Sequence, residues 1–176
     1  MNATAPTVLA VIGNPRLDSR THRIARTVAA ELRRALDVPA TDLDEVDLAP
    51  LGPRVLDFDD SAVAREVERV LAADVLVVAS PTYKATYSGL LKAFLDRVGT
   101  GALSGSAVPI LLGGAPNHTL AIDTHFTPLL QELGAATPAR GLFVLESALD
   151  AFEDTAAAWA DRWAPWLAPR ALNVAS

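Results

Sequence analysis

The chain has 176 residues, of which 51% are hydrophobic and 20% are charged. This composition suits one globular domain with a proper core, so we take residues 1–176 as a single domain. The formal net charge of −6 disfavours nucleic acid as a partner, and the lack of cysteine excludes disulfides, thiolate metal ligands and a cysteine nucleophile. With neither a signal-peptide pattern nor an apolar run of about 20 residues, we expect a cytoplasmic protein that does not engage a membrane.

Short apolar runs recur along the chain and predict the strands. They cover Thr7–Ile12, Val75–Ala79, Val108–Leu112 and Gly141–Leu145. The runs are apolar throughout rather than alternating with polar residues, which predicts strands covered on both faces, as in a parallel sheet. A weaker strand is expected between Val38 and Leu48, where the many acidic residues indicate an edge position.

Helical patterns fill the intervals between these runs. Apolar residues recur every three to four positions over Ile24–Leu36, Val63–Leu71, Leu90–Val98, Leu120–Leu133 and Phe152–Trp166. In the fourth helix Pro128 marks a kink or a late start. Trp159, Trp163 and Trp166 share one face of the last helix, a spacing typical of core or subunit packing. Five strand–helix alternations predict a doubly wound α/β sheet.

The segment after the first strand carries groups suited to an anion. Gly13 allows a turn, Pro15 stiffens the loop, and Arg16 offers donors that match phosphate oxygens. Ser19 and Thr21 add hydroxyls at the start of the first helix, where free N–H groups also favour an anion. Taken alone, the stretch fits a plain turn with Ser19 or Thr21 as helix N-cap equally well.

The segment after the third strand offers a surface for a planar ligand. Pro81 fixes an extended course, and Thr82, Tyr83 and Lys84 then present backbone groups and an aromatic ring. Ser88 leads into the next helix. The alternative is an ordinary loop with surface tyrosines and a serine N-cap.

The segment after the fourth strand contains a glycine pair. Gly113 and Gly114 permit close approach of the backbone to a ligand, so their N–H groups could meet the carbonyl oxygens of a ring. Asn117 and His118 follow, and we interpret His118 as a capping or surface residue rather than a catalyst.

Missing motifs narrow the chemistry further. The chain has no G-x-G-x-x-G after the first strand, no G-x-x-x-x-G-K-[ST] and no G-x-S-x-G. Its Asp and His residues lack metal-ligand spacing, so we expect no metal and no side-chain catalyst. One phosphate, one flat ring system and little side-chain catalysis together describe a site for flavin mononucleotide (FMN).

The same segments resemble a known family. G-x-P-R-x-x-S-x-T from Gly13 and P-x-Y-x-x-x-Y-S-G-x-L-K-x-x-L-D over Pro81–Asp96 resemble the NAD(P)H-dependent FMN reductases. The Gly113-Gly114 pair and the run from Ala121 to Leu130 also fit, and the pattern is most similar to the subgroup that feeds reduced flavin to sulfonate-using monooxygenases. The resemblance covers roughly residues 7–147.

The resemblance implies a flavodoxin-like fold with a five-stranded parallel sheet of order 2-1-3-4-5. It implies FMN as cofactor, NADPH or NADH as hydride donor to the flavin N5, and a homodimer or homotetramer that buries the helix after the third strand. The resemblance implies that Arg16, Ser19 and Thr21 bind the FMN phosphate. The residues implied along the ring and ribityl chain are Pro81, Thr82, Tyr83, Lys84 and Ser88. Gly113 and Gly114 are implied at the pyrimidine edge of the ring.

Two positions depart from the family pattern. Asn14 stands where the family usually has serine, and it keeps a polar side chain at the FMN phosphate. Thr124 stands where the sulfonate-linked subgroup often has a tyrosine that bears on helix distortion, tetramer packing and weak flavin retention. The chain therefore also fits a reductase that holds FMN as a prosthetic group.

Three other functions remain open on the sequence. A quinone, azo or nitro reductase with tightly bound FMN would share nearly every motif. A flavodoxin-type electron carrier would bind FMN without turning over NAD(P)H, although this chain lacks the T-x-T-G-x-T-like loop typical of flavodoxins. A flavin-free receiver-like module would need clustered acids at the strand ends, which here read Gly-Asn-Pro and Ser-Pro-Thr. Arg20 and Lys84 are candidates to receive the phosphates of NAD(P)H.

Overall fold

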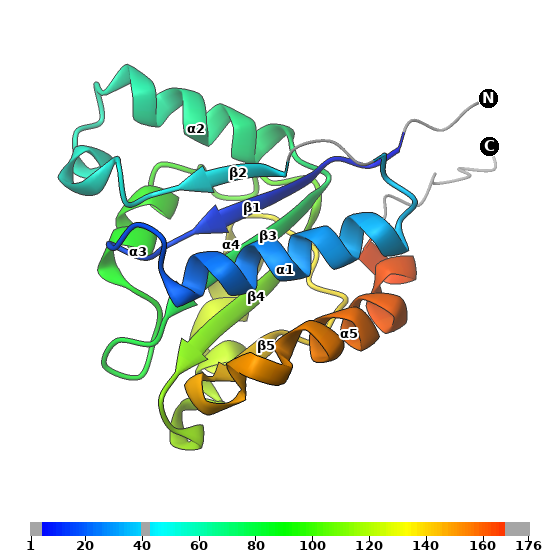
Figure 1. Cartoon of the computed structure of the whole chain (residues 1–176). Helices are drawn as coiled ribbons and strands as arrows, with labels where there is room; N and C mark the ends of the chain where they lie inside the picture. Colours follow the sequence, from blue (N-terminus) through cyan, green and yellow to red (C-terminus); the bar gives the residue numbers. More distant parts are fainter. Residues whose placement is uncertain (1–4, 40–42, 168–176) are drawn as a thin grey trace.

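The computed structural model describes residues 5–39 and 43–167. Its centre is a five-stranded parallel sheet of order β2-β1-β3-β4-β5 (Figure 1). The strands are β1 (Val8–Ile12), β2 (Asp44–Asp47), β3 (Val75–Pro81), β4 (Ser106–Gly113) and β5 (Leu142–Leu145). This confirms the predicted fold class, strand order and edge position of β2; part of the range predicted for that strand, residues 40–42, lies outside the described residues.

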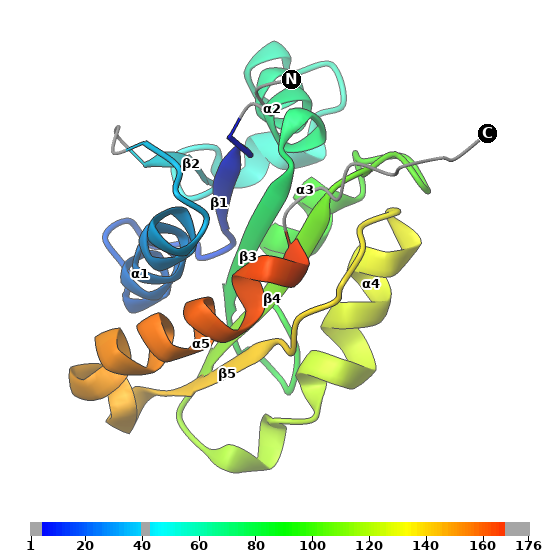
Figure 2. The ribbon, with the colours of Figure 1, turned by 90° about the vertical axis from the view of Figure 1, so that its right-hand side faces the viewer.

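Helices cover both faces of the sheet, because nearly every strand residue is apolar. One face carries α1 (Arg20–Ala35) and α5 (Phe152–Leu167), and α1 packs on β1 and on α5, in a core that includes Val8, Ala10 and Ile12. The other face carries α2 (Ser61–Ala72), α3 (Gly89–Leu95) and α4 (Thr127–Glu132), as Figure 2 shows, and its core includes Leu9 and Val11. Successive side chains of β1 therefore enter the two cores in turn, as expected for a strand that is buried on both faces of the sheet.

The fourth helix begins late, as Pro128 predicted, and a π-helical turn, η3 (Ile122–Phe126), precedes it. The Thr127 N–H donates to the carbonyl of Ile122, five residues earlier. Proline has no N–H for the carbonyl four residues before it, and its ring crowds that carbonyl, so the turn before Pro128 widens. The distortion forms with Thr124 in place of the subgroup's tyrosine, which shows that the tyrosine is not required for it.

Other elements differ from the sequence prediction only in detail. The helix predicted over Leu90–Val98 ends at Leu95, and three short 3-10 helices, η1 (Gly52–Leu56), η2 (Pro116–His118) and η4 (Glu146–Ala151), lie in the loops. Of the tryptophans on α5, Trp159 is buried and its Nε1 donates to the Arg140 carbonyl at 3.0 Å, whereas Trp166 is 55% exposed. Within residues 5–39 and 43–167, no helix is long and apolar enough to cross a membrane.

Candidate functional site

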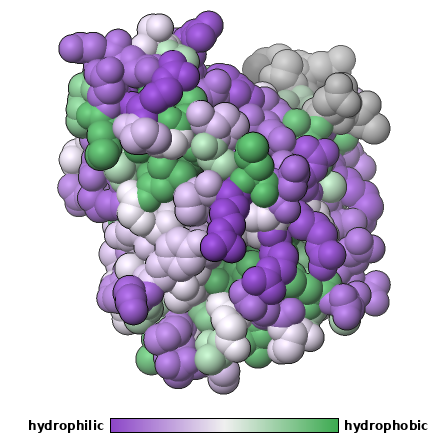
Figure 3. Space-filling view, turned by 60° about the vertical axis from the view of Figure 1, so that its left-hand side comes forward, coloured by the Kyte–Doolittle hydropathy of each residue, from purple (hydrophilic) through white to green (hydrophobic). Residues whose placement is uncertain are grey.

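The loops that follow β1, β3 and β4 meet at one edge of the sheet, as the sequence predicted. The Gly13 N–H donates to the Ala79 carbonyl at 2.8 Å, and the Thr82 N–H donates to the Leu112 carbonyl at 2.7 Å. These bonds extend the ladder past the strand ends and hold the three loops side by side. Figure 3 brings this side of the molecule forward, and it shows apolar surface intermixed with hydrophilic surface.

Asn14 and Thr21 organise the loop after β1 from the inside. Both are buried, and the Asn14 Nδ2 donates to the Thr21 Oγ1 at 2.9 Å. The Asn14 Oδ1 accepts from the Arg16 N–H at 2.9 Å, so one amide side chain fixes both arms of the loop. The sequence offered Asn14 as a polar group for a phosphate, and the structure shows in addition that it sets the loop's shape.

Arg16 and the start of α1 present positive charge to solvent. The Arg16 side chain is exposed and has no carboxylate partner among the described residues. Ser19 is the N-cap of α1, since its Oγ accepts from the His22 N–H at 3.1 Å, and the first turn of α1 contains no acidic residue. The positive end of the helix dipole and the guanidinium therefore lie on the same loop, in which Asp18, just before the N-cap, is an exposed acid that forms no ion pair with any described residue.

The loop after β3 is a tight hairpin, which the sequence did not predict. Tyr83 and Thr86 pair across it, with their N–H groups donating to each other's carbonyls at 2.8 and 3.2 Å. Lys84 and Ala85 form the turn with φ values of 51° and 66°. Two central residues with positive φ define the type I′ turn that suits a two-residue hairpin. Lys84 is exposed at the tip, and Tyr83 is 44% exposed beside it.

Thr82 carries a polar atom without a partner. Its Oγ1 is buried and makes no hydrogen bond to any part of the chain that the structure describes. A buried hydroxyl of this kind normally has a partner, since an unpaired one costs about 1–3 kcal/mol. Pro81 pairs with Leu112 in the sheet, so the unpaired atom lies beside the strand end that leads into Gly113.

Ser88 is an internal tie between two of the loops. It is 2% exposed, and its Oγ donates to the Gly13 carbonyl at 2.5 Å while accepting from the Leu91 N–H at 3.1 Å. Its own N–H donates to the Ser80 Oγ at 2.8 Å. The structure thus places Ser88 beneath the loops as the N-cap of α3, where it positions the loop after β1 against the loop after β3.

The glycine pair after β4 has two different surroundings. A Cβ added at Gly113 would lie 2.5 Å from the Phe143 Cζ, so the ring of Phe143 occupies the space of a side chain there. A Cβ at Gly114 would meet nothing within 4 Å, and the residue is exposed at the mouth of the loop. Asn117 and His118 lie in η2, with Asn117 Nδ2 and His118 Nε2 3.4 Å apart.

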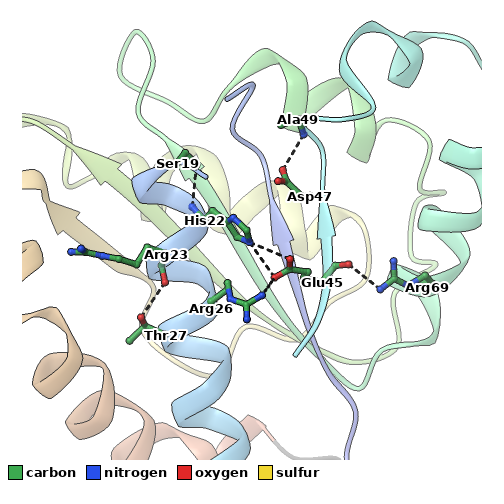
Figure 4. A network of polar contacts seen from close by, with 9 residues as sticks. All are labelled: Ser19, His22, Arg23, Arg26, Thr27, Glu45, Asp47, Ala49 and Arg69. Carbon is green, nitrogen blue, oxygen red and sulfur yellow. Dashed lines mark hydrogen bonds and ion pairs between the residues drawn. The ribbon is translucent and has the colours of Figure 1, made fainter. Parts of the chain in front are cut away.

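A polar network joins α1 to the edge strand β2 behind this site (Figure 4). The Glu45 carboxylate contacts the His22 Nε2 at 3.2 Å and the Arg26 guanidinium at 2.7 Å. Burial alone raises the pKa of Glu45, but the hydrogen bonds from His22 and Arg26 outweigh burial and lower it. Burial raises the pKa of the neighbouring Asp47, whose Oδ1 accepts from the Ala49 N–H at 3.0 Å. Glu45 therefore ties the edge strand to α1 through partners that its place in an acid-rich segment did not indicate.

The comparisons with known proteins fit this geometry. The family model described as NADPH-dependent FMN reductase matches residues 6–150. The chain belongs to the NADPH-dependent FMN reductase family. As a member, it is an oxidoreductase that uses FMN and NAD(P)H.

Curated relatives share most of the chain. It is 36% identical over 141 residues to FMN reductase (NADPH) of Escherichia coli, covering 80% of this chain and 73% of that protein. It is 33% identical over 156 residues to NADH-dependent FMN reductase SfnF of Pseudomonas putida, covering 85% of this chain and 83% of that protein. Among solved structures, apo NADH:FMN oxidoreductase EmoB superposes with a TM-score of 0.77 at 28% identity, covering 94% of this chain and 92% of that one.

Replacement of Ser88 tests the tie beneath the site. Ser88→Ala removes the donor to the Gly13 carbonyl and the acceptor of the Leu91 N–H, and leaves both groups buried without a partner. We expect the free energy of unfolding to fall by about 2 kcal/mol, measured by urea denaturation. Ser104→Ala, at an exposed serine, is the control and should change it by less than about 0.5 kcal/mol. Equal effects of the two substitutions would show that the tie is not structural.

The network behind the site predicts a pH dependence. Because the folded-state pKa of Glu45 lies below its ordinary value of 4.5, its contribution to stability is complete above that value and is lost as pH falls through the lower folded pKa. Glu45→Gln should therefore cost about 0.5–1 kcal/mol near neutral pH, and the difference from the unsubstituted protein should shrink below the ordinary pKa.

Urea unfolding at several pH values between 7 and about 3 measures this dependence. Glu68→Gln, on an exposed part of α2, is the matched control, and its difference in unfolding free energy from the unsubstituted protein should not change with pH in this way. A gap between Glu45→Gln and the unsubstituted protein that persists unchanged into acid would refute the role of the ion pairs.

Proposed function

We propose that the chain reduces FMN with NAD(P)H at the edge where the three loops meet, and that it supplies the reduced flavin to a partner monooxygenase. The buried, unpaired Thr82 Oγ1 carries the proposal, because β3 lies between β1 and β4, so Thr82 follows the strand between the loop that bears Arg16 and the glycine pair. Membership of the FMN reductase family supports FMN as that ligand.

At the phosphate end, the residues fit a dianion. Arg16 is exposed without a carboxylate partner among the described residues, and the first turn of α1 contains no acid, although Asp18 precedes its N-cap. We assign the phosphate to Arg16 and the N–H groups around Ser19 and Thr21. Asn14 and the buried Thr21 hydroxyl hold the loop in the shape that presents these groups.

At the ring end, the residues offer backbone groups and one aromatic side chain. We assign the ring and ribityl chain to Pro81, Thr82, Tyr83 and Lys84, and the pyrimidine edge to the N–H groups of Gly113 and Gly114. Tyr83 and Lys84 sit on the hairpin tip beside the unpaired Thr82 hydroxyl. Ser88 contributes from below by fixing the loops rather than by touching the ligand.

The protein's part in the reaction is positioning and electrostatics. FMN, when bound, supplies the redox chemistry by taking a hydride from the nicotinamide at its N5 atom. In this assignment the described residues would hold the phosphate with positive charge and offer N–H donors to the pyrimidine edge. No side chain is needed as acid or base.

Two basic side chains, Lys84 and Arg20, are candidates to bind the phosphates of NAD(P)H. Lys84 is exposed at the hairpin tip, with no carboxylate partner in the described ranges. Arg20, the other candidate, forms an ion pair with Glu146 at 3.0 Å. We therefore favour Lys84 over Arg20. The donor itself stays open, since the Escherichia coli relative is named for NADPH and SfnF of Pseudomonas putida for NADH.

The supply of reduced flavin rests on the similarity to the sulfonate-linked subgroup. We further propose one domain over residues 1–176, a cytoplasmic location, and assembly as a homodimer or homotetramer. Tight retention of FMN with quinone, azo or nitro reduction is the alternative, and curated azoreductases match about half of this chain.

The deciding experiment is purification with added FMN followed by gel filtration and assay with each nucleotide. We expect a nearly colourless protein that oxidises NADPH or NADH only when free FMN is added. Stoichiometric FMN after gel filtration, with quinone reduction in its absence from the buffer, would instead establish the tightly bound reductase. Bound FMN with no nucleotide oxidation would indicate an electron carrier, and no FMN binding at micromolar protein would overturn the site.

Replacement of Arg16 tests the phosphate end. Arg16→Ala should weaken FMN binding by about tenfold to a hundredfold, as expected for the loss of a charge-assisted contact of about 1.5–3 kcal/mol. Its effect on unfolding should stay within about 0.5 kcal/mol, because the side chain is exposed. FMN fluorescence titration and urea unfolding measure the two quantities. Arg65→Ala, at an exposed arginine of α2, is the control, and equal FMN affinities for the two variants would rule out Arg16 as the phosphate ligand.

A further inference from the structure

The loop after β1 carries an acid among the groups that we assign to the FMN phosphate. Asp18 lies two residues after Arg16 and directly before Ser19, the N-cap of α1. Its side chain is exposed, and it forms no ion pair or hydrogen bond with any part of residues 5–39 and 43–167. The loop from Gly13 to Ser19 contains no other charged residue, so its side-chain charges cancel.

The backbone at Asp18 does not require a carboxylate. Its φ is 49°, in the left-handed region, where asparagine and aspartate are the most common residues after glycine. An asparagine would therefore adopt the same conformation without the charge. The charge at this position can thus be separated from the shape of the loop.

The neighbouring basic side chains do not restore a positive balance, because each is held by a partner. Arg20 pairs with Glu146 at 3.0 Å, Arg26 pairs with Glu45 at 2.7 Å, and the Arg23 guanidinium donates to a main-chain carbonyl of η4 at 3.1 Å. Within the described part of this loop and the first two turns of α1, the loop's own guanidinium is the one arginine side chain without an acidic or carbonyl partner.

A second acid lies beside the same loop. Asp47 ends β2, where it is in register with Ile12, the last residue of β1 before Gly13. Burial is the main cause that raises the pKa of Asp47, and the negative charge of Asp18 adds to the rise. The field of the Asp18 carboxylate therefore extends to the end of β1, where the phosphate loop begins.

We propose that Asp18 is a specificity-determining residue of this site, and that its carboxylate repels the FMN phosphate and so limits how tightly FMN is held. The inference rests on the proposed function, because it takes the phosphate to lie at Arg16 and the start of α1. Two residues along the chain span at most about 7 Å between Cα atoms, which is less than the Debye length of about 10 Å at 0.1 M salt.

A phosphate dianion at this loop would therefore meet attraction from one guanidinium and the helix dipole, and repulsion from one carboxylate of comparable reach. The balance favours a flavin that exchanges readily with solvent. Such exchange is what delivery of reduced FMN to a second enzyme requires.

Removal of the charge tests the inference. Asp18→Asn should tighten FMN binding about threefold to tenfold at low ionic strength and at a pH above about 6, the second pKa of a phosphate monoester. The gain should nearly vanish at about 1 M salt, where the Debye length falls to about 3 Å. FMN fluorescence titration measures both effects. Glu68→Gln, on an exposed part of α2, removes an equal charge elsewhere and is the control.

Riboflavin gives the second readout, because it has the ring and ribityl chain of FMN but no phosphate. Asp18→Asn should leave its affinity unchanged. Asp18→Gly, which also lacks the carboxylate and suits a positive φ, should reproduce the gain for FMN and serves if the asparagine variant fails to fold.

The outcomes separate this inference from the proposed function. Equal FMN affinities of Asp18→Asn and Glu68→Gln, or riboflavin binding that tightens as much as FMN binding, would overturn the role of Asp18 and leave the FMN site standing. An unsubstituted protein that binds no FMN would overturn the proposed function and this inference with it.

Discussion

The hydrogen bond from the Ser88 hydroxyl to the Gly13 carbonyl joins the parts on which the candidate site depends. It crosses between the loop after β1 and the start of α3, two segments 75 residues apart in the chain. A parallel sheet brings strand ends to one edge, but it does not by itself fix how the loops beyond them are oriented. Here a single buried serine caps α3 and holds the Gly13 carbonyl, so the loop after β1 is fixed against the start of α3.

Asn14 shows how one side chain can fix the shape of a whole loop. Its amide donates through one atom and accepts through the other, and both bonds stay within the loop. The residue therefore acts chiefly on the backbone of Arg16 and on the buried hydroxyl of Thr21. The polar groups that remain free to meet a ligand are then the guanidinium and the N–H groups at the helix start.

Much of the fold and part of the site could be predicted from the sequence. Unbroken apolar runs are a strong signal for buried parallel strands, and the residues that follow them mark the ligand edge, so the convergence of Gly13, Thr82 and Gly113 was predictable. The hairpin at Lys84 and Ala85 was not, because neither residue type favours positive φ and tertiary contacts impose the turn. The partners of Glu45 were equally hidden, since they lie on α1, far away in the sequence.

Gly113 and Phe143 bear on how such a chain can vary over evolutionary time. The ring of Phe143 fills the space that a side chain at position 113 would need, and the same ring lines a groove beside β5. A larger residue in place of Gly113 would require a smaller residue in place of Phe143, and the loss of that ring would change the shape of the groove. The strand end that faces the ligand and the outer edge of the sheet are therefore constrained to change together, so substitutions at the two positions should be correlated among related sequences.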